Sequence, residues 1–286
     1  MKHVQRSIVY ILLLLLAAAI VIPVLWSFVA SIKQNHEFYG SPWTLPEGFY
    51  FQNYIDAWVK ANMGSFLFNS VIVTALSLLL LLVIALPAAY ILARYKFFGN
   101  NLISLLFMAG LFININYIIV PIFLMLNKGD KLARAWIGEP ILLNNIFILA
   151  VVYCAMALPF TIYLLISYFK TLSGEYAEAA SVDGAGHYRT MLQVYMPMAR
   201  PAIVTVILFN FLSFWNEYII SMTLMTKPDF KTLPTGLMNL LAAQKSAVEY
   251  GQLYAGLVLV MLPTLILYMI VQKKLTQGMT MGGLKG

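Results

Sequence analysis

Long runs of apolar residues dominate the hydrophobic pattern of this chain. A helix that crosses a bilayer needs about 20 mostly apolar residues, and six stretches are long enough. They lie at about residues 8–32, 70–93, 102–126, 141–169, 202–225 and 253–271. Membrane-spanning β-strands would be shorter and would alternate in polarity. The pattern therefore predicts an all-α integral membrane protein, with one transmembrane domain of six helices over residues 1–286.

Composition and charge agree with a membrane protein. Hydrophobic residues make up 62% of the 286 residues and charged residues 10%, against about 45–50% and about 25% in soluble domains. The net charge of +7 indicates basic loops at a membrane face rather than nucleic-acid binding. One cysteine, Cys154, and three scattered histidines offer neither a disulfide framework nor metal-ligand spacing.

The first apolar stretch has two interpretations. Its basic start and its alanines at residues 17–19 fit a secretory signal peptide. However, its apolar region continues to about Ala30, beyond the about 7–15 residues of a signal-peptide core. We therefore favour an uncleaved first span.

The distribution of Lys and Arg predicts the orientation. Six spans place both termini on one side, with ten basic residues there and eight on the other. Those that directly flank spans, such as Arg94, Lys96 and Lys170, lie on the side of the termini. The positive-inside rule then places both termini in the cytoplasm, together with a tail at residues 272–286.

A polar segment at about residues 173–198 separates the fourth and fifth spans on the same cytoplasmic side. Ser173 suits a helix N-cap and Glu175 the first helical turn. Gly184 suits a left-handed position after a helix, and a second short helix is expected from about His187 to Tyr195. The segment is acidic and rich in alanine, which favours docking to a protein over lying on the lipid surface.

The spacing in this segment resembles the EAA loop of permease subunits in ABC importers, E-A-A-x3-G-x9-I-x-L-P. The matching residues are Glu178, Ala179, Ala180, Gly184, Val194, Met196 and Pro197, with Val and Met in place of Ile and Leu. The resemblance implies a coupling helix that inserts into a cytoplasmic ATPase. The residues that it assigns to ATPase docking are Glu175, Glu178, Ala179, Ala180, Asp183, Gly184, His187 and Pro197.

Two further regions are similar to maltose-type sugar permeases. These are the outer segment at residues 45–54 and the final sequence QGMTMGGLKG at residues 277–286. The resemblance implies that the tail, with Gly278, Gly282 and Lys285, reaches the interface between two ATPase subunits. The chain thus resembles the permease subunit of a carbohydrate ABC importer, for an oligosaccharide by analogy, in a bacterial inner or plasma membrane.

The chain has no P-loop, no candidate catalytic triad and no acidic metal cluster. We therefore expect a subunit that is not an enzyme and binds no cofactor. The resemblance implies that ATP and Mg are bound by two copies of a partner ATPase. It also implies a second permease subunit and an extracytoplasmic solute-binding protein. The outer loop at residues 227–252, with a short helix expected near residues 234–250, either contacts that binding protein, as the resemblance implies, or is a solvated connector.

One acidic residue, Glu217, lies well inside a predicted span, where a charge costs about 2.5–3.5 kcal/mol on insertion scales. At helical spacing it shares one face with Asn210, Ser213 and Ser221. This stripe either lines a translocation cavity or bonds a neighbouring helix or partner permease. We favour a structural or gating role, because in the maltose-type pair the other permease mainly holds the sugar. The same alternatives apply to Asn114 and Asn116.

Two other classes of protein are weighed against this interpretation. A secondary transporter driven by an ion gradient would require an intramembrane charge relay and internal repeats, neither of which is evident in the sequence. A membrane-embedded enzyme would require clustered aspartates or His and Glu metal ligands at membrane depth. Transport coupled to ATP hydrolysis by a partner would distinguish the importer from both.

Overall fold

The computed structural model describes residues 2–243 and 249–283, which form helices and no strands. Four helices are long and apolar enough to cross a membrane: α1 (Lys2–Ala30), α4 (Met63–Arg94), α7 (Ile146–Thr171) and α14 (Tyr250–Gly283). Counting each of two bent helix pairs as one span raises the number to six. The all-α membrane fold is therefore confirmed.

The predicted third and fifth spans are not single straight helices. The third contains α5 (Asn100–Gly110) and α6 (Ile115–Ile137), which meet at 100°. In the fifth, α11 (Arg200–Trp215) ends before α12 (Ile219–Leu224) begins. Hydropathy averages do not detect these breaks, because the few polar residues at them lower the mean over a window of about 20 residues only slightly.

The chain divides into two compact units. The first comprises Met1–Leu67 and Leu233–Leu265, and the second comprises Phe68–Thr232 and Ile266–Gly286. Two of the boundaries fall inside α4 and α14, so each of these helices contributes to both units, and the third falls just before residue 233.

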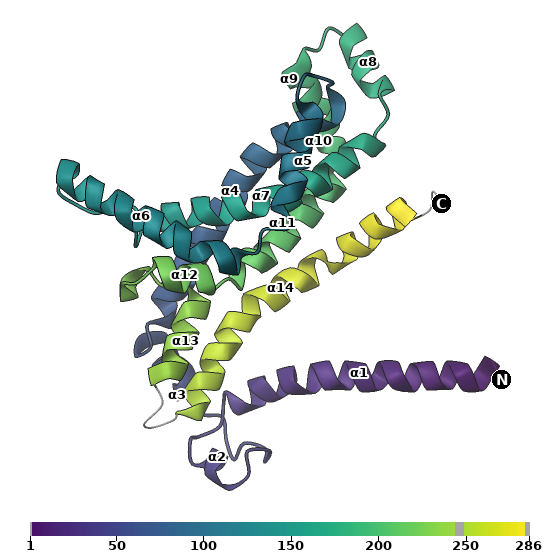
Figure 1. The fold of residues 1–286 in the computed structure, drawn as a ribbon. Helices are drawn as coiled ribbons and strands as arrows, with labels where there is room; N and C mark the ends of the chain where they lie inside the picture. Colours follow the sequence, from purple (N-terminus) through teal and green to yellow (C-terminus); the bar gives the residue numbers. More distant parts are fainter. Residues whose placement is uncertain (1, 244–248, 284–286) are drawn as a thin grey trace. The chain divides into compact units, whose positions relative to one another are not determined.

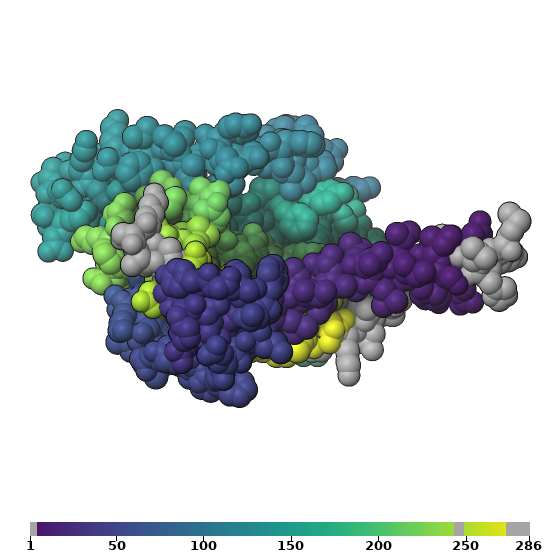
Figure 2. Space-filling model, turned by 90° about the horizontal axis from the view of Figure 1, so that it is seen from below, coloured from purple at the N-terminus to yellow at the C-terminus, as the bar shows by residue number. Residues whose placement is uncertain are grey.

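The first unit holds α1, α2 (Glu37–Gly40), α3 (Gln52–Val59) and α13 (Leu233–Ala243). The Asn53 side chain donates hydrogen bonds to the carbonyl oxygens of Ser31 (2.9 Å) and Lys33 (2.8 Å), which ties α3 to the end of α1. Figure 2 shows α1, in purple, extending from the dark-blue segment that follows it. None of the most apolar part of α1 is buried within the chain, as expected of a helix that contacts lipid or another subunit.

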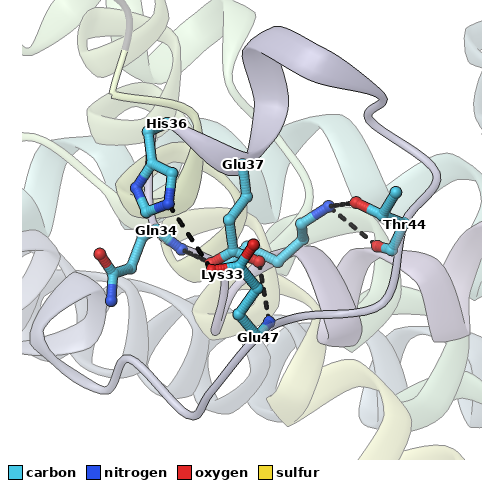
Figure 3. Close-up of polar contacts among 6 residues, drawn as sticks. All are labelled: Lys33, Gln34, His36, Glu37, Thr44 and Glu47. Atoms are coloured by element: carbon cyan, nitrogen blue, oxygen red, sulfur yellow. Dashed lines mark hydrogen bonds and ion pairs between the residues drawn. The ribbon is translucent and has the colours of Figure 1, made fainter.

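A buried polar cluster shapes the loop after α1 (Figure 3). Lys33 is fully buried, and its Nζ donates to the carbonyl oxygen (2.9 Å) and the hydroxyl oxygen (3.2 Å) of Thr44. Its ammonium also lies 5.1 Å from the ring centroid of Phe38, within cation–π range. The Glu37 carboxylate accepts N–H bonds from Gln34 (2.7 Å) and Glu47 (3.0 Å). These two charged side chains hold residues 33–47 in one conformation.

The second unit contains one hydrophobic core, built mainly from α4, α7 and α11. Both α5 and α11 pack against α7, and α12 packs against α6 and α7 (Figure 1). Fully buried residues of this core include Leu81, Leu149, Ile162, Leu165, Phe169, Tyr195 and Val206. Shorter elements complete the unit: α8 (Glu175–Val182), α9 (His187–Thr190), the π-helix η1 (Met191–Tyr195), α10 (Met196–Met198) and the 3-10 helix η2 (Pro228–Phe230).

We predict that acid loosens the loop at residues 33–47. Burial would raise the pKa of Glu37, but the N–H donors of Gln34 and Glu47 and the charges of Lys33 and His36 outweigh it and lower the pKa. The stabilisation is therefore present above the ordinary carboxyl pKa and is lost as the pH falls through the lower, folded value. Hydrogen exchange, corrected for its intrinsic pH dependence, should show protection of this loop falling at acidic pH.

The matched variant is Glu37→Gln, which replaces one acceptor oxygen by a donor that faces a backbone N–H. This change should lower the stability of the loop by about 1–3 kcal/mol. It should also remove the dependence of the loop's hydrogen-exchange protection on acid. An unchanged acid dependence in the variant would contradict the role assigned to Glu37.

Candidate functional site

The EAA-like segment forms a helix, a turn and a second helix at one end of the second unit (Figure 1). The Ser173 Oγ accepts the N–H of Glu175 at 3.2 Å, at the start of α8. Gly184 has φ +74°, the left-handed conformation that glycine adopts without strain. The Ala185 N–H donates to the Ala180 carbonyl at 2.9 Å and closes the turn.

The second helix differs from the expected one. The α-helical part, α9, ends at Thr190, and the chain continues as the π-helix η1 to Tyr195 before α10 begins. A π-helical turn contains one extra residue, and such turns are frequent at functional sites. It joins α9 to α10, on the path from the turn at Gly184 to the start of α11.

Seven of the eight predicted docking residues are exposed: Glu175, Glu178, Ala179, Asp183, Gly184, His187 and Pro197. Ala180 is the exception, because its side chain is buried inside the loop. The sequence reasoning overlooked three large exposed residues beside them: Tyr176, Val182 (88% exposed) and Tyr188 (81% exposed). Their size and spacing among small polar residues could have indicated anchors for a partner.

Arg94, at the end of α4, holds the start of this loop. Its guanidinium donates to the carbonyl oxygens of Leu172 (2.9 Å) and Ser173 (2.8 Å). It also bonds the hydroxyl of Tyr195 and lies 4.6 Å from the centroid of that ring. The Tyr195 hydroxyl donates to the Ser173 carbonyl at 3.0 Å. We call Arg94, Ser173 and Tyr195 the arginine clamp; it joins α4, the end of α7 and η1.

A cavity of about 900 Å³ lies behind α8, between it and the end of α4. Glu178, Ala177 and Ser181 line it from α8, and Tyr95 and His187 line it from the opposite side. The Tyr95 hydroxyl and the His187 Nδ1 are 2.8 Å apart and share a hydrogen bond. The helix is thus supported at its ends rather than packed along its whole inner face.

Glu217 lies in the break between α11 and α12 and not on a continuous helical stripe. Its carboxylate accepts the N–H groups of Ile220 (2.8 Å) and Ser221 (3.1 Å) and the hydroxyl of Tyr153 (2.7 Å). It therefore begins α12 in the manner of an N-cap. The single stripe predicted from spacing is wrong, because α11 ends at Trp215.

The other intramembrane candidates also have partners within the chain. Asn210 donates to the Thr161 Oγ1 at 3.0 Å, and Ser221 shares a hydrogen bond of 2.8 Å with Thr232. The Asn114 side chain accepts the N–H of Asn116 at 2.9 Å and caps α6.

A cavity of about 560 Å³ nevertheless brings four of these residues together: Asn114, Asn210, Ser213 and Glu217. Tyr153, Phe160, Phe209 and Phe214 contribute aromatic surface to the same cavity. Asn116 and Ser221 are not part of its lining. The lining of the cavity thus combines polar and aromatic side chains.

The tail residues complete the set of predicted positions. Gly278 and Gly282 fall within α14, and Lys285 lies outside the described residues. Among the residues that the structure describes, no group of three or more His, Cys, Asp or Glu side chains is placed to hold a metal ion.

Helices apolar enough to span a membrane, an exposed helical loop and a partly polar cavity between the helices are the features of a transport permease. Residues 85–281 match the family described as binding-protein-dependent transport system inner membrane component. The chain belongs to this family, whose members are membrane-embedded transport subunits and not themselves the catalytic ones. This membership replaces the interpretation as an ion-driven secondary transporter.

Relatives agree with the family, and a solved structure shares the fold. The chain is 36% identical to the diacetylchitobiose uptake system permease protein NgcG of Streptomyces coelicolor, over 96% of this chain and 88% of the relative. It is 28% identical to the trehalose/maltose transport system permease protein MalG of Thermococcus litoralis, over 99% and 98%. The fold matches a chain of a bacterial ABC transporter involved in import of the acidic polysaccharide alginate, with TM-score 0.81, 24% identity and 95% and 96% coverage.

We predict that Arg94→Ala loosens the loop. The change removes charged hydrogen bonds to the carbonyls of Leu172 and Ser173, each worth about 1.5–3 kcal/mol. Hydrogen exchange at residues 173–198 should accelerate about tenfold or more. The matched control is Arg189→Ala, which removes an exposed bond to Gln193 in the same loop; equal acceleration in both variants would refute the clamp.

We also predict that Glu217→Ala lowers the free energy of unfolding of the purified chain by about 1–3 kcal/mol, because three donors lose their acceptor. Ser213→Ala changes the same cavity at an exposed residue and should stay within about 0.5 kcal/mol of the wild type. If Glu217→Ala leaves unfolding unchanged but abolishes transport, Glu217 acts in the pathway rather than in the fold.

Proposed function

We propose that this chain forms half of the translocation pathway of an ATP-driven sugar importer in a bacterial membrane. A second permease subunit completes the pathway, two copies of a cytoplasmic ATPase supply the energy, and an extracytoplasmic binding protein delivers the sugar. The chain itself binds no cofactor; ATP and Mg belong to the ATPase. The observation that carries the proposal is the exposed helix α8, in a loop that the arginine clamp joins to α4 just before α8 begins.

Docking through α8 follows from its surface. The helix is short and projects from the second unit, and Tyr176 and Val182 stand exposed on it, with Tyr188 just beyond the turn. Large apolar side chains that fill pockets on a partner supply most of the binding energy of typical interfaces. Glu175, Glu178 and Asp183 surround them with negative charge and favour a partner groove with basic residues.

Transmission of motion follows from the clamp. Covalent bonds join the loop to α7 and α11, and Arg94 adds a third connection to α4. A displacement of α8 by the ATPase therefore moves the ends of three helices together. We infer that the loop lies in the cytoplasm with both termini and that the tail, with Gly278, Gly282 and Lys285, meets the ATPase pair.

The substrate class rests on the relatives. Their names refer to diacetylchitobiose, to trehalose and maltose, and to multiple sugars. We infer an oligosaccharide. The hydrogen-bonding of Glu217 and Asn210 within the chain supports a structural or gating role for these residues, in line with the sequence-based preference.

Site-specific crosslinking tests the docking. In a Cys154→Ser background, Val182→Cys places a thiol on the outer side of the loop, a better position than the buried Ala180. Single cysteines in the grooves of candidate sugar-importer ATPases should form disulfides with it in co-expressed membranes. The control is Lys128→Cys, in α6, which should form none.

The experiment also has a clear negative result. If the ATPase that co-purifies with the chain from its native membrane forms no disulfide with residue 182, the docking proposal fails. Equal crosslinking at residue 128 would also contradict the proposal, because it would show that the disulfides form by random collision.

A further inference from the structure

A second cavity, of about 470 Å³, lies where α4 and α7 end and α5 begins. It is distinct from the cavity behind α8, although both share the residues 93–96 as a wall. Asn100 shapes it by donating to the carbonyl oxygens of Leu92 (3.2 Å) and Tyr95 (2.6 Å), which folds the loop between α4 and α5 back on itself.

The lining of this cavity is positively charged. Lys96 and Lys170 are exposed and line it from the end of α4 and from the last turn of α7. Arg94 adds a third positive charge, although its donors bond carbonyl oxygens of the loop. The lining contains no Asp or Glu, so its charge is not balanced within the cavity. Such a cavity fits an anion.

The surroundings of the cavity are apolar. Phe98 follows Lys96 by two residues and is fully exposed, and Phe97 is 42% exposed. The adjoining helix α5 has no buried residue, and Leu102, Leu105 and Leu106 are more than half exposed. The two helices that end here, α4 and α7, are both apolar enough to span a membrane. The cavity therefore lies at the level where spans leave the hydrocarbon.

We propose that this cavity binds the phosphate headgroup of an anionic phospholipid. Lys96 and Lys170 contact the phosphate, and Phe98 and the exposed face of α5 contact the acyl chains. Basic pockets between transmembrane helices are suited to anionic headgroups, and the apolar surface beside this one favours a lipid over a free anion. Because Arg94 belongs both to this cavity wall and to the arginine clamp, a bound lipid lies directly beside the support of α8.

Native mass spectrometry of the purified full-length chain tests the proposal. The chain is titrated with phosphatidylglycerol and, separately, with phosphatidylcholine of the same acyl chains. We expect tighter binding of phosphatidylglycerol, and a loss of about fivefold in its affinity for each lysine removed in the double variant Lys96→Gln, Lys170→Gln. The charge-conserving double variant Lys96→Arg, Lys170→Arg should retain the preference.

The control removes two equally exposed lysines elsewhere, in Lys128→Gln, Lys131→Gln, and should behave as the wild type. Equal affinity for the two lipids, or an unchanged preference after Lys96→Gln, Lys170→Gln, would overturn the proposal. Displacement of the lipid by millimolar inorganic phosphate would assign the cavity to a free anion. Unchanged lipid binding with loss of ATPase binding in the same variant would assign it to the ATPase.

Discussion

The interaction on which the second unit depends is the contact between one guanidinium and the carbonyl groups at the end of α7. The last four carbonyls of a helix have no partner within it, and in a membrane protein their desolvation is costly. Arg94 supplies charged donors to this end, and Tyr195 adds a hydroxyl that bonds the same Ser173 carbonyl. Together with the Tyr95–His187 hydrogen bond and the two covalent ends, they hold the loop to the spans.

Polar side chains at membrane depth serve the same purpose elsewhere in the unit. Asn114 begins α6 and Glu217 begins α12, each by accepting backbone N–H groups that a broken helix exposes. The cost of placing Glu217 in the spans is offset by three donors. Residues of both breaks, Ile113 and Asn114 in the first and Glu217 in the second, line the cavity of about 560 Å³.

The helices and the coupling-type loop could be predicted from sequence for different reasons. Long apolar runs must be helical in lipid, and the loop has residues at fixed spacing, from Glu178 to Pro197. The breaks at residues 111–114 and 216–218 could not be predicted, since capping depends on which N–H groups a side chain reaches.

From the sequence, Arg94 indicates only the topology. Its role in the clamp could not be predicted, because its partners are mostly backbone carbonyls, which every residue has. The burial of Ala180, one of the residues assigned to docking by the motif, could not be predicted either, because the motif gives spacing and not the side of α8 that packs inward.

The arginine clamp also has a consequence for the order in which the chain is made. Arg94 and Tyr195 are 101 residues apart. At the usual speed of translation, about 5–20 s pass between the two. The third and fourth predicted spans are made during that interval. For most of it the guanidinium has neither Ser173, which is made 79 residues after Arg94, nor Tyr195 to bond. Because an unpaired guanidinium is costly inside the bilayer, Arg94 must stay in water at the bilayer surface until then. This requirement fixes the depth of α4 before the rest of the unit is made.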